Sequence, residues 1–158
     1  MEEIEIASRV PARPDAVWER VVTPEGINHE LRPWLRMTIP RSLSGATVDD
    51  VPVGVPLGRS WILLLGVIPI DFDDLLISEL EPGRRFLETS STMSASRWEH
   101  ERTLTGTDDG TEIRDRIRFE PRGVVGRISL ARRLLYSVVE ATFRHRHRRL
   151  ALYFGTSS

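Results

Sequence analysis

The sequence predicts an α+β fold in which a curled antiparallel sheet of about seven strands wraps round one long C-terminal helix. Residues 58–119 contain several short segments that alternate between apolar and polar side chains, as strands do. The later segment Val124–Phe154 instead repeats its apolar residues at threes and fours and contains no proline. One strand and two short helices precede both regions. Because the apolar stripe of the long helix must be buried, we expect it to lie against the inner face of the sheet.

Length and composition indicate a single domain that covers residues 1–158. The hydrophobic content of 40% is ordinary, and the net charge of −1 gives no overall attraction for nucleic acid or for an anionic membrane. The absence of cysteine excludes disulfides, thiolate metal sites and cysteine nucleophiles. The N-terminus lacks the features of a signal peptide, and the longest apolar run is too short to span a bilayer. These features favour a cytoplasmic protein without membrane insertion.

The clearest local pattern is a β-hairpin over Ser96–Phe119, with a turn at Thr107-Asp108-Asp109-Gly110. One register satisfies both strands, and a slip by one residue would exchange their faces. On the inner face this register pairs Leu104 with Ile113, Arg102 with Asp115, His100 with Ile117 and Trp98 with Phe119. On the outer face it pairs Thr103 with Arg114, Glu101 with Arg116 and Glu99 with Arg118, so that opposite charges face each other.

The remaining elements follow from turn and capping signals. The first half of the chain predicts a strand at Glu3–Arg9, a helix at Asp15–Val22, a helix that begins with Thr23 as N-cap and Pro24, a strand at Trp34–Ile39 and an irregular segment at Arg41–Gly58. An irregular connection of that length indicates a functional flap or partial disorder. The second half predicts strands at Gly58–Ile70, Asp71–Leu80 and Arg85–Thr92, with a bend at Pro69 and Ile70. The stripe of the long helix consists of Leu130, Leu134, Leu135, Val138, Val139, Thr142, Phe143, Leu150 and Tyr153.

Three motifs in this order resemble one protein superfamily. They are Val10-Pro11-Ala12-Arg13-Pro14-Asp15-Ala16-Val17-Trp18, the hairpin pair Trp98-Glu99-His100-Glu101-Arg102 with Gly110-Thr111-Glu112-Ile113-Arg114-Asp115, and Phe143-Arg144-His145-Arg146. Together with the element order, they resemble the helix-grip fold of the START and birch-pollen-allergen superfamily, also called SRPBCC or polyketide cyclase/dehydrase proteins. The resemblance covers nearly the whole chain. It implies a cavity between sheet and helix in proteins that bind hydrophobic ligands, catalyse cyclisations or assist a chaperone.

His100, Arg102 and Asp115 share the inner face of the hairpin and are the candidate catalytic residues. Charges on an inward face need partners or water, so the residues indicate a partly polar cavity. In the functional interpretation they orient the polar end of a ligand, and His100 is the best proton carrier among them. In the structural interpretation Arg102 and Asp115 form an internal ion pair that braces the sheet. Both interpretations remain open at this stage.

Aromatic and apolar residues supply the remaining predicted wall of the cavity. The predicted ligand-binding set is Trp61, Phe86, Trp98, His100, Arg102, Asp115, Ile117, Phe119, Val139 and Tyr153. Asp71, Asp73 and Asp74 lack the spacing of a calcium loop, so a solvated strand end is expected there rather than a metal site. Glu88 is a further candidate for an inward position. We expect neither a metal nor a cofactor.

Two surface features suggest possible partners. The basic run Arg144–Arg149 points round the whole helix, so a solvated helix end is favoured over nucleic-acid binding. The apolar segment Trp61–Ile68 predicts cover for the outer face of the sheet, by the Arg41–Gly58 flap or by a second copy in a homodimer.

The predicted function is the binding of a small hydrophobic ligand, such as a lipid or polyketide, in the internal cavity, with an entrance near Arg41–Gly58. One alternative is a cyclase or dehydratase that uses His100 to carry a proton and Arg102 to polarise a carbonyl. Another alternative is a protein-interaction module of the chaperone-activator type. Whether the protein is an enzyme stays open, and a binding protein is the favoured reading.

Overall fold

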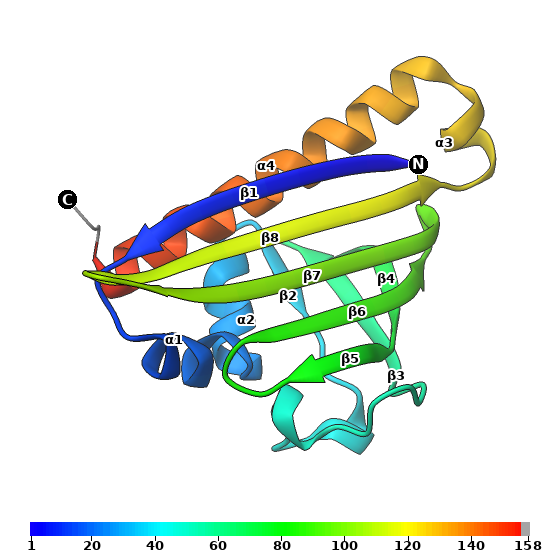
Figure 1. Cartoon of the computed structure of the whole chain (residues 1–158). Helices are drawn as coiled ribbons and strands as arrows, with labels where there is room; N and C mark the ends of the chain where they lie inside the picture. Colours follow the sequence, from blue (N-terminus) through cyan, green and yellow to red (C-terminus); the bar gives the residue numbers. More distant parts are fainter. Residues whose placement is uncertain (156–158) are drawn as a thin grey trace.

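The computed structural model describes residues 1–155 and shows an α+β domain (Figure 1). Its strands are β1 (Glu2–Val10), β2 (Leu35–Met37), β3 (Gly58–Leu64), β4 (Ile68–Leu75), β5 (Ile77–Glu81), β6 (Arg85–Thr92), β7 (Ala95–Thr107) and β8 (Gly110–Pro121). Its helices are α1 (Pro14–Val21), α2 (Pro24–Leu31), α3 (Gly123–Arg127) and α4 (Ser129–Phe154), with short 3₁₀ turns η1 (Arg41–Leu43) and η2 (Val48–Asp50). The predicted α+β class is confirmed.

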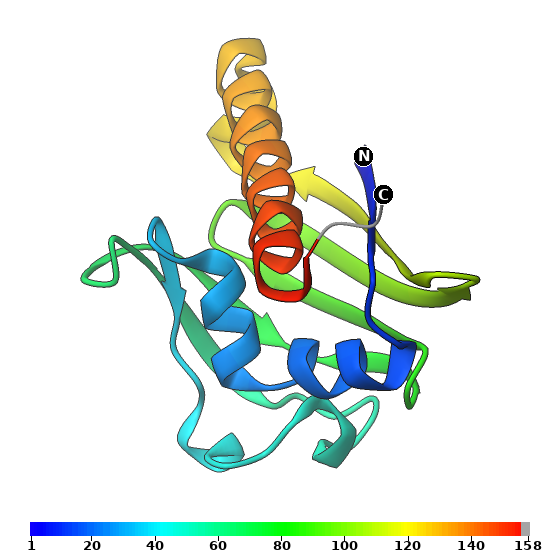
Figure 2. The same cartoon turned by 90° about the vertical axis from the view of Figure 1, so that its left-hand side faces the viewer.

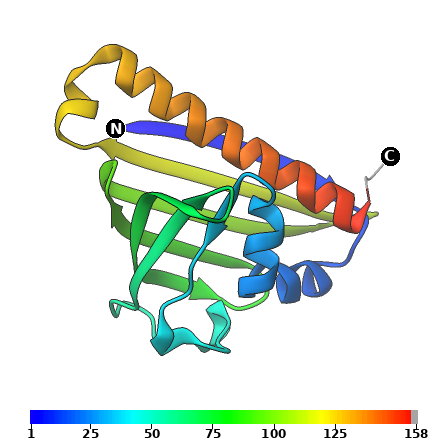
Figure 3. The ribbon, with the colours of Figure 1, turned by 180° about the vertical axis from the view of Figure 1, so that it is seen from behind.

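The strands form one antiparallel sheet in the order β1-β8-β7-β6-β4-β3-β2, with β5 beside β6. The sheet curls, and α4 crosses its concave side while α1 and α2 lie at one end (Figures 1 and 2). Seen from behind, the segment with η1 and η2 extends below the β3–β4 hairpin (Figure 3). This is the predicted helix-grip arrangement, in which the inner sheet face and the helix enclose the interior.

The β7–β8 hairpin has the predicted register in every pair. On the inner face the pairs are Leu104–Ile113, Arg102–Asp115, His100–Ile117 and Trp98–Phe119. On the outer face they are Thr103–Arg114, Glu101–Arg116 and Glu99–Arg118. On the outer face Glu99 forms an ion pair with Arg118. The neighbouring strands complete the ladder, because Glu101 pairs with Arg85 of β6 and Arg116 with Glu5 of β1.

The helix pair α1–α2 is also formed as its sequence predicts. The Thr23 side chain accepts a hydrogen bond of 3.0 Å from the Gly26 backbone N–H, and Pro24 occupies the first helical position. A Cβ atom at Gly26 would lie 1.8 Å from the carbonyl oxygen of Arg20, so only glycine permits this close approach of the two helices. The cap therefore fixes how α2 presents its inner face to the sheet.

Three predicted boundaries are wrong. The strand expected over Asp71–Leu80 is divided at Leu76, because β4 pairs with the end of β6 and β5 with its beginning. The strand expected over Gly58–Ile70 is two strands, because Leu65 and Gly66 take left-handed backbone angles, with φ of 53° and 80°, and turn the chain before Pro69. The helix expected over Val124–Phe154 is interrupted at Ile128, whose extended backbone separates α3 from α4. The apolar segment Trp61–Ile68 is thus a hairpin tip rather than a single strand.

The core lies between the inner sheet face and the helices, in two clusters. One joins Val10, Val17, Trp18, Phe86, Leu104, Ile113 and Leu150, and the other joins Ile4, Ile6, Ile117, Phe119, Val139 and Phe143. The predicted stripe is buried only in the later turns of α4, since Leu130 and Leu134 are exposed where the helix extends beyond the sheet (Figure 2). None of the helices in residues 1–155 is long and apolar enough to cross a membrane.

Candidate functional site

Asp115, at the centre of β8, is the hub of a buried polar network. Its Oδ1 accepts hydrogen bonds from Arg102 Nε at 2.8 Å and from His100 Nε2 at 2.9 Å. Its Oδ2 accepts from Arg102 Nη2 at 2.6 Å and from His147 Nε2 at 2.8 Å. Asp115 and Arg102 are fully buried. The carboxylate is therefore hydrogen-bonded by the bidentate Arg102 guanidinium and by two imidazoles instead of by water.

The ionised Asp115 fixes the tautomers of both histidines. Burial by itself would raise the pKa of Asp115, but the charge and hydrogen bonds of Arg102, and after them His100, hold that pKa well below its ordinary value. A carboxylate only accepts hydrogen bonds, so each neutral imidazole must carry its proton on Nε2. His147 Nδ1 then accepts from the Ser8 hydroxyl at 2.5 Å. In its neutral form His100 would likewise carry a lone pair on Nδ1, on the side of the ring away from Asp115.

Glu30 of α2 extends the network to the C-terminal helix. It is completely buried, and its Oε1 lies 2.8 Å from Arg102 Nη1 and 3.4 Å from Arg146 Nε. Burial would lower the pKa of Arg102, but the charges of Asp115 and Glu30 raise it above its ordinary value. Arg146 also lies over the Phe143 ring, 4.9 Å from the ring centroid. Two guanidiniums and two carboxylates therefore alternate in one buried chain.

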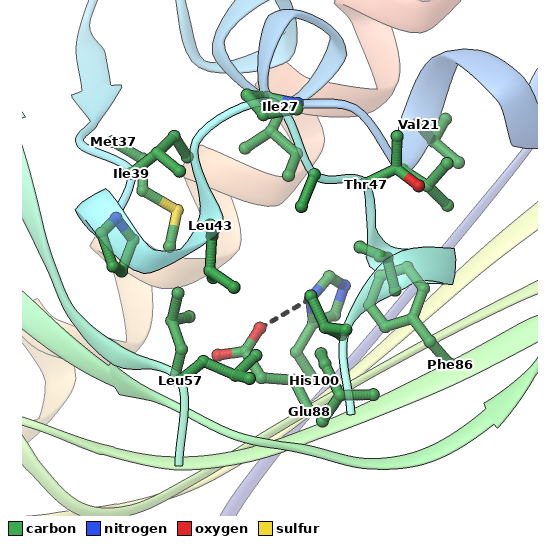
Figure 4. Close-up of a pocket in the computed structure, with 18 of the residues that line it drawn as sticks. Val21, Ile27, Met37, Ile39, Leu43, Thr47, Leu57, Phe86, Glu88 and His100 are labelled. Carbon is green, nitrogen blue, oxygen red and sulfur yellow. Dashed lines mark ion pairs between the residues drawn. The ribbon is translucent and has the colours of Figure 1, made fainter. Parts of the chain in front are cut away.

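Two neighbouring chambers lie beside this network. The flap chamber, of about 110 Å³, lies under the segment of residues 39–57 and includes Leu43, Leu57 and Phe86 in its wall (Figure 4). The helix chamber, of about 190 Å³, lies under α4. Its wall includes Asp73, Trp98, Val139 and Thr142. Both are lined by Ile27, Met37, Glu88, His100 and Arg146, so these residues stand where the chambers meet.

Two wall residues of the helix chamber are partly exposed. Ile70 of β4 and Val138 of α4 line this chamber, yet 45% and 51% of their surfaces are exposed. The flap chamber, by contrast, has half-buried residues of the segment 39–57 as its cover. Ile70 and Val138 therefore mark the partly exposed side of the helix chamber, and the entrance near Arg41–Gly58 stays a prediction.

A pair of acidic side chains forms the polar part of the helix chamber. Asp73 of β4 is 7% exposed and lies beside Glu88 of β6. Burial, and after it the neighbouring charge of Glu88, raises the pKa of Asp73 well above its ordinary value, which favours the protonated form of Asp73. Glu88 Oε2 lies 3.9 Å from His100 Nδ1 (Figure 4). Two carboxyls and an imidazole thus line up along the chamber.

The predicted site residues divide into wall residues and supporting residues. Phe86, Trp98, His100 and Val139 line the chambers. Arg102 and Asp115 are together with His100, as predicted, but behind it within the network rather than on the wall. Ile117 and Phe119 face inward and are fully buried in the cluster with Phe143, where α4 covers them.

Two predicted wall positions are wrong. Trp61 is 40% exposed and packs edge-on against Phe72, because alternation along β3 places its neighbour Ser60, and not Trp61, on the buried side. Tyr153 is 51% exposed and contacts His29 and the Arg20 guanidinium at the edge of α2. Both side chains lie away from the chambers.

The sequence interpretation also missed four polar residues of the interior. Asp73 was expected at a solvated strand end, and Arg146 and His147 at a solvated helix end, but all three are buried. The signal was present, because continuing the Val139–Phe143 spacing by one turn reaches positions 146 and 147 before Leu150. Glu30 similarly lies on the helical face of Ile27. The suggested inward position of Glu88 is confirmed, opposite His100 in the β6–β7 register.

Comparison with known proteins places the chain in a family. A profile described as a domain of unknown function, DUF8410, matches residues 8–154. The chain belongs to the DUF8410 family. No curated protein matches this DUF8410 domain.

Solved structures with the same fold include three named proteins. Protein CV1439 from Chromobacterium violaceum is 15% identical, with a TM-score of 0.73 over 99% of this chain and 100% of that chain. The Zhui aromatase/cyclase from Streptomyces sp. R1128 is 18% identical, with a TM-score of 0.67 over 94% of this chain and 90% of that chain. Ara h 8.0201 is 13% identical, with a TM-score of 0.58 over 95% and 98%. This DUF8410 domain therefore shares its fold with these three proteins, and this is the helix-grip fold that its motifs predicted.

Proposed function

We propose that the protein binds a small hydrophobic ligand in the two neighbouring chambers. The observation that carries this proposal is the pair of open spaces, of about 110 and 190 Å³, with mainly apolar walls and a few polar groups at their junction. Binding sites for small molecules have this composition, with volumes of roughly 300–1,000 Å³. Each chamber is smaller than that range and only the two together reach its lower end, so a compact ligand fits better than a long lipid chain.

In this proposal the body and the polar group of the ligand contact different residues. Ile27, Met37, Phe86, Trp98 and Val139 offer apolar surface to the body of the ligand. His100, Glu88 and Arg146 stand where the chambers meet and can form hydrogen bonds with its polar group. Arg102 and Asp115 hold His100 in place from behind. An interaction module is less well supported, because its interior would be filled by side chains.

Filling the helix chamber is expected to abolish binding. Thr142→Trp places a large ring in this chamber from a half-buried position on α4, so the affinity for the uncharged probe N-phenyl-1-naphthylamine should fall at least about tenfold. Fluorescence titration of the probe measures the change. Leu130→Trp, at an exposed position of the same helix, is the matched control and should bind as the wild type does. Equal affinity in Thr142→Trp and wild type would contradict the proposal.

A second candidate function is enzymatic proton transfer by His100, of the kind that a cyclase or dehydratase needs. The observation that favours it is the fixed tautomer: Asp115 binds the Nε2–H, and the Nδ1 lone pair lies on the side of Glu88 and the chambers. An imidazole oriented by a buried carboxylate is suited to general base catalysis.

Deuterium exchange tests this second function. The probe is 1-phenylbutane-1,3-dione, whose acidic C2–H can be removed by His100 Nδ1 and replaced by deuterium from the solvent. Wild-type protein should accelerate the exchange above the buffer rate, and His100→Ala should lose most of the acceleration, given the 10²–10⁴-fold effect of a typical general base. Exchange at the buffer rate with wild-type protein would leave only the binding function.

The apolar β3–β4 tip keeps the proposal of a homodimer open. Leu65, Val67 and Ile68 are more than half exposed, and exposed groups of apolar residues are common at interfaces. Light scattering at micromolar concentration should give the mass of two chains, and Val67→Glu should return the mass to one chain because a charge enters the interface. A wild-type mass equal to one chain would contradict self-association.

A further inference from the structure

The charged groups around the helix chamber are mostly acidic. Asp71 and Asp73 come from β4, Glu88 from β6, His100 from β7 and Arg146 from α4. Asp71 is occupied by local contacts, since it accepts hydrogen bonds from the Ser94 hydroxyl and from the backbone N–H groups of residues 72 and 93. The Asp73–Glu88 pair is therefore the acidic group that a ligand can reach.

The only cation in the described wall of this chamber is already paired. Arg146 pairs with Glu30, Glu30 with Arg102, and Arg102 with Asp115. In this series of ion pairs the two guanidinium charges balance the two carboxylate charges. Even with one of its two carboxyls protonated, the Asp73–Glu88 pair adds a negative charge to the wall that the paired Arg146 does not balance.

Asp73 also has an oxygen without a partner. Its Oδ1 is buried and forms no hydrogen bond with any group in residues 1–155, although Asp73 lines the chamber. A buried polar atom without a partner is destabilising, and a ligand that donates a hydrogen bond to it would remove this cost. The unpaired oxygen calls for a hydrogen-bond donor and the negative charge calls for a cation, and an ammonium group is both.

We propose that the helix chamber selects hydrophobic ligands that carry a basic nitrogen, which the Asp73–Glu88 pair binds as an ammonium group. This inference rests on the proposed binding function and names the class of its ligand. An ammonium group can donate to both carboxyls at once, whereas an alcohol brings one donor and no charge, and a carboxylate is repelled. When an ammonium group enters, the proton of the Asp73–Glu88 pair leaves for the solvent and both carboxylates face the cation.

Calorimetric titration with three matched probes tests the inference. The probes share a naphthalene body: 2-naphthylmethylamine, 2-naphthalenemethanol and 2-naphthoate. At pH 7 the amine should bind at least about tenfold more tightly than the alcohol, and the carboxylate most weakly. Titrations in phosphate and in Tris, which differ in their heats of ionisation, should show close to one proton released for each amine bound and none for the alcohol.

Neighbouring variants separate the acidic pair from general effects. Asp73→Asn and Glu88→Gln should each remove the preference for the amine and its proton release, while alcohol binding persists and shows that the chamber is intact. Asp74→Asn is the control, because Asp74 is on the same strand but pairs with Arg59 outside the chamber. Equal binding of amine and alcohol would overturn the inference and leave the binding function intact. Binding of none of the three probes would contradict both.

Discussion

Arg102→Met is expected to lower the free energy of unfolding by about 3–5 kcal/mol, the usual cost of breaking a buried ion pair on one side. The methionine side chain fills similar space but leaves Asp115 and Glu30, both completely buried, without their shared cation. Guanidinium denaturation at pH 7, followed by circular dichroism, measures the loss. Arg116→Met is the control, since Arg116 of β8 is partly exposed and its ion pair with Glu5 should contribute at most about 1 kcal/mol.

Removing the orphaned carboxylates should recover part of that loss. Adding Asp115→Asn and Glu30→Gln to Arg102→Met replaces two buried charges by neutral amides, so the triple variant should be more stable than Arg102→Met alone. The three residues are in direct contact, and their effects should therefore be far from additive. A loss below about 1 kcal/mol in Arg102→Met, or additive losses in the triple variant, would show that the network does not brace the sheet.

The same network shows how much a sequence can predict. The β7–β8 register follows from residues near one another in the chain, because alternation and the outer charge pairs agree on one alignment. That alignment places His100, Arg102 and Asp115 on one face and predicts their meeting. Local signals of this kind also identify both bounds of β6 and the beginning of α2 at Pro24.

The remaining part of the site depends on contacts between distant segments. Glu30 and Arg146 are separated along the chain by most of the sheet, and nothing near either residue indicates the other. A local reading of charged runs predicts solvent for Asp73, Arg146 and His147, because isolated charges are rarely buried. Burial is favourable here only because each charge meets its partner from another element, and that becomes visible only in the folded chain.

Asp73→Asn is expected to stabilise the protein at pH 8, in contrast to most changes of buried residues. Burial and the charge of Glu88 raise the pKa of Asp73 in the folded state, so the folded protein holds a proton that the unfolded chain has released. This difference lowers stability as pH rises above the unfolded pKa of about 3.9, until the folded pKa is passed. Asparagine never ionises. The gain should be at least about 1 kcal/mol, since each unit of pKa shift corresponds to 1.4 kcal/mol.

The pH dependence distinguishes this effect from simple repacking. The gain from Asp73→Asn should shrink as pH falls towards about 4 and vanish below it, because the unfolded chain then also takes up the proton at its pKa of about 3.9. The effect of pH on stability has the opposite sign for Asp115, because folding lowers the pKa of this carboxyl. Asp115 therefore contributes stability above the unfolded pKa of about 3.9, and this contribution is lost as pH falls through the folded pKa.

Denaturation midpoints at pH 4, 6 and 8 therefore give a different pattern for each variant. Asp115→Asn should be less stable than the wild type at pH 8, with a deficit that decreases only in acid. Asp74→Asn should change stability by no more than about 1 kcal/mol, because Asp74 and its partner Arg59 are partly exposed. A gain from Asp73→Asn that is equal at pH 4 and pH 8 would mean that packing, not the proton of Asp73, sets the stability of the acidic pair. The proton release expected on amine binding would then lose its physical basis. Measurements of stability without a ligand therefore also test the proposed selectivity for amines.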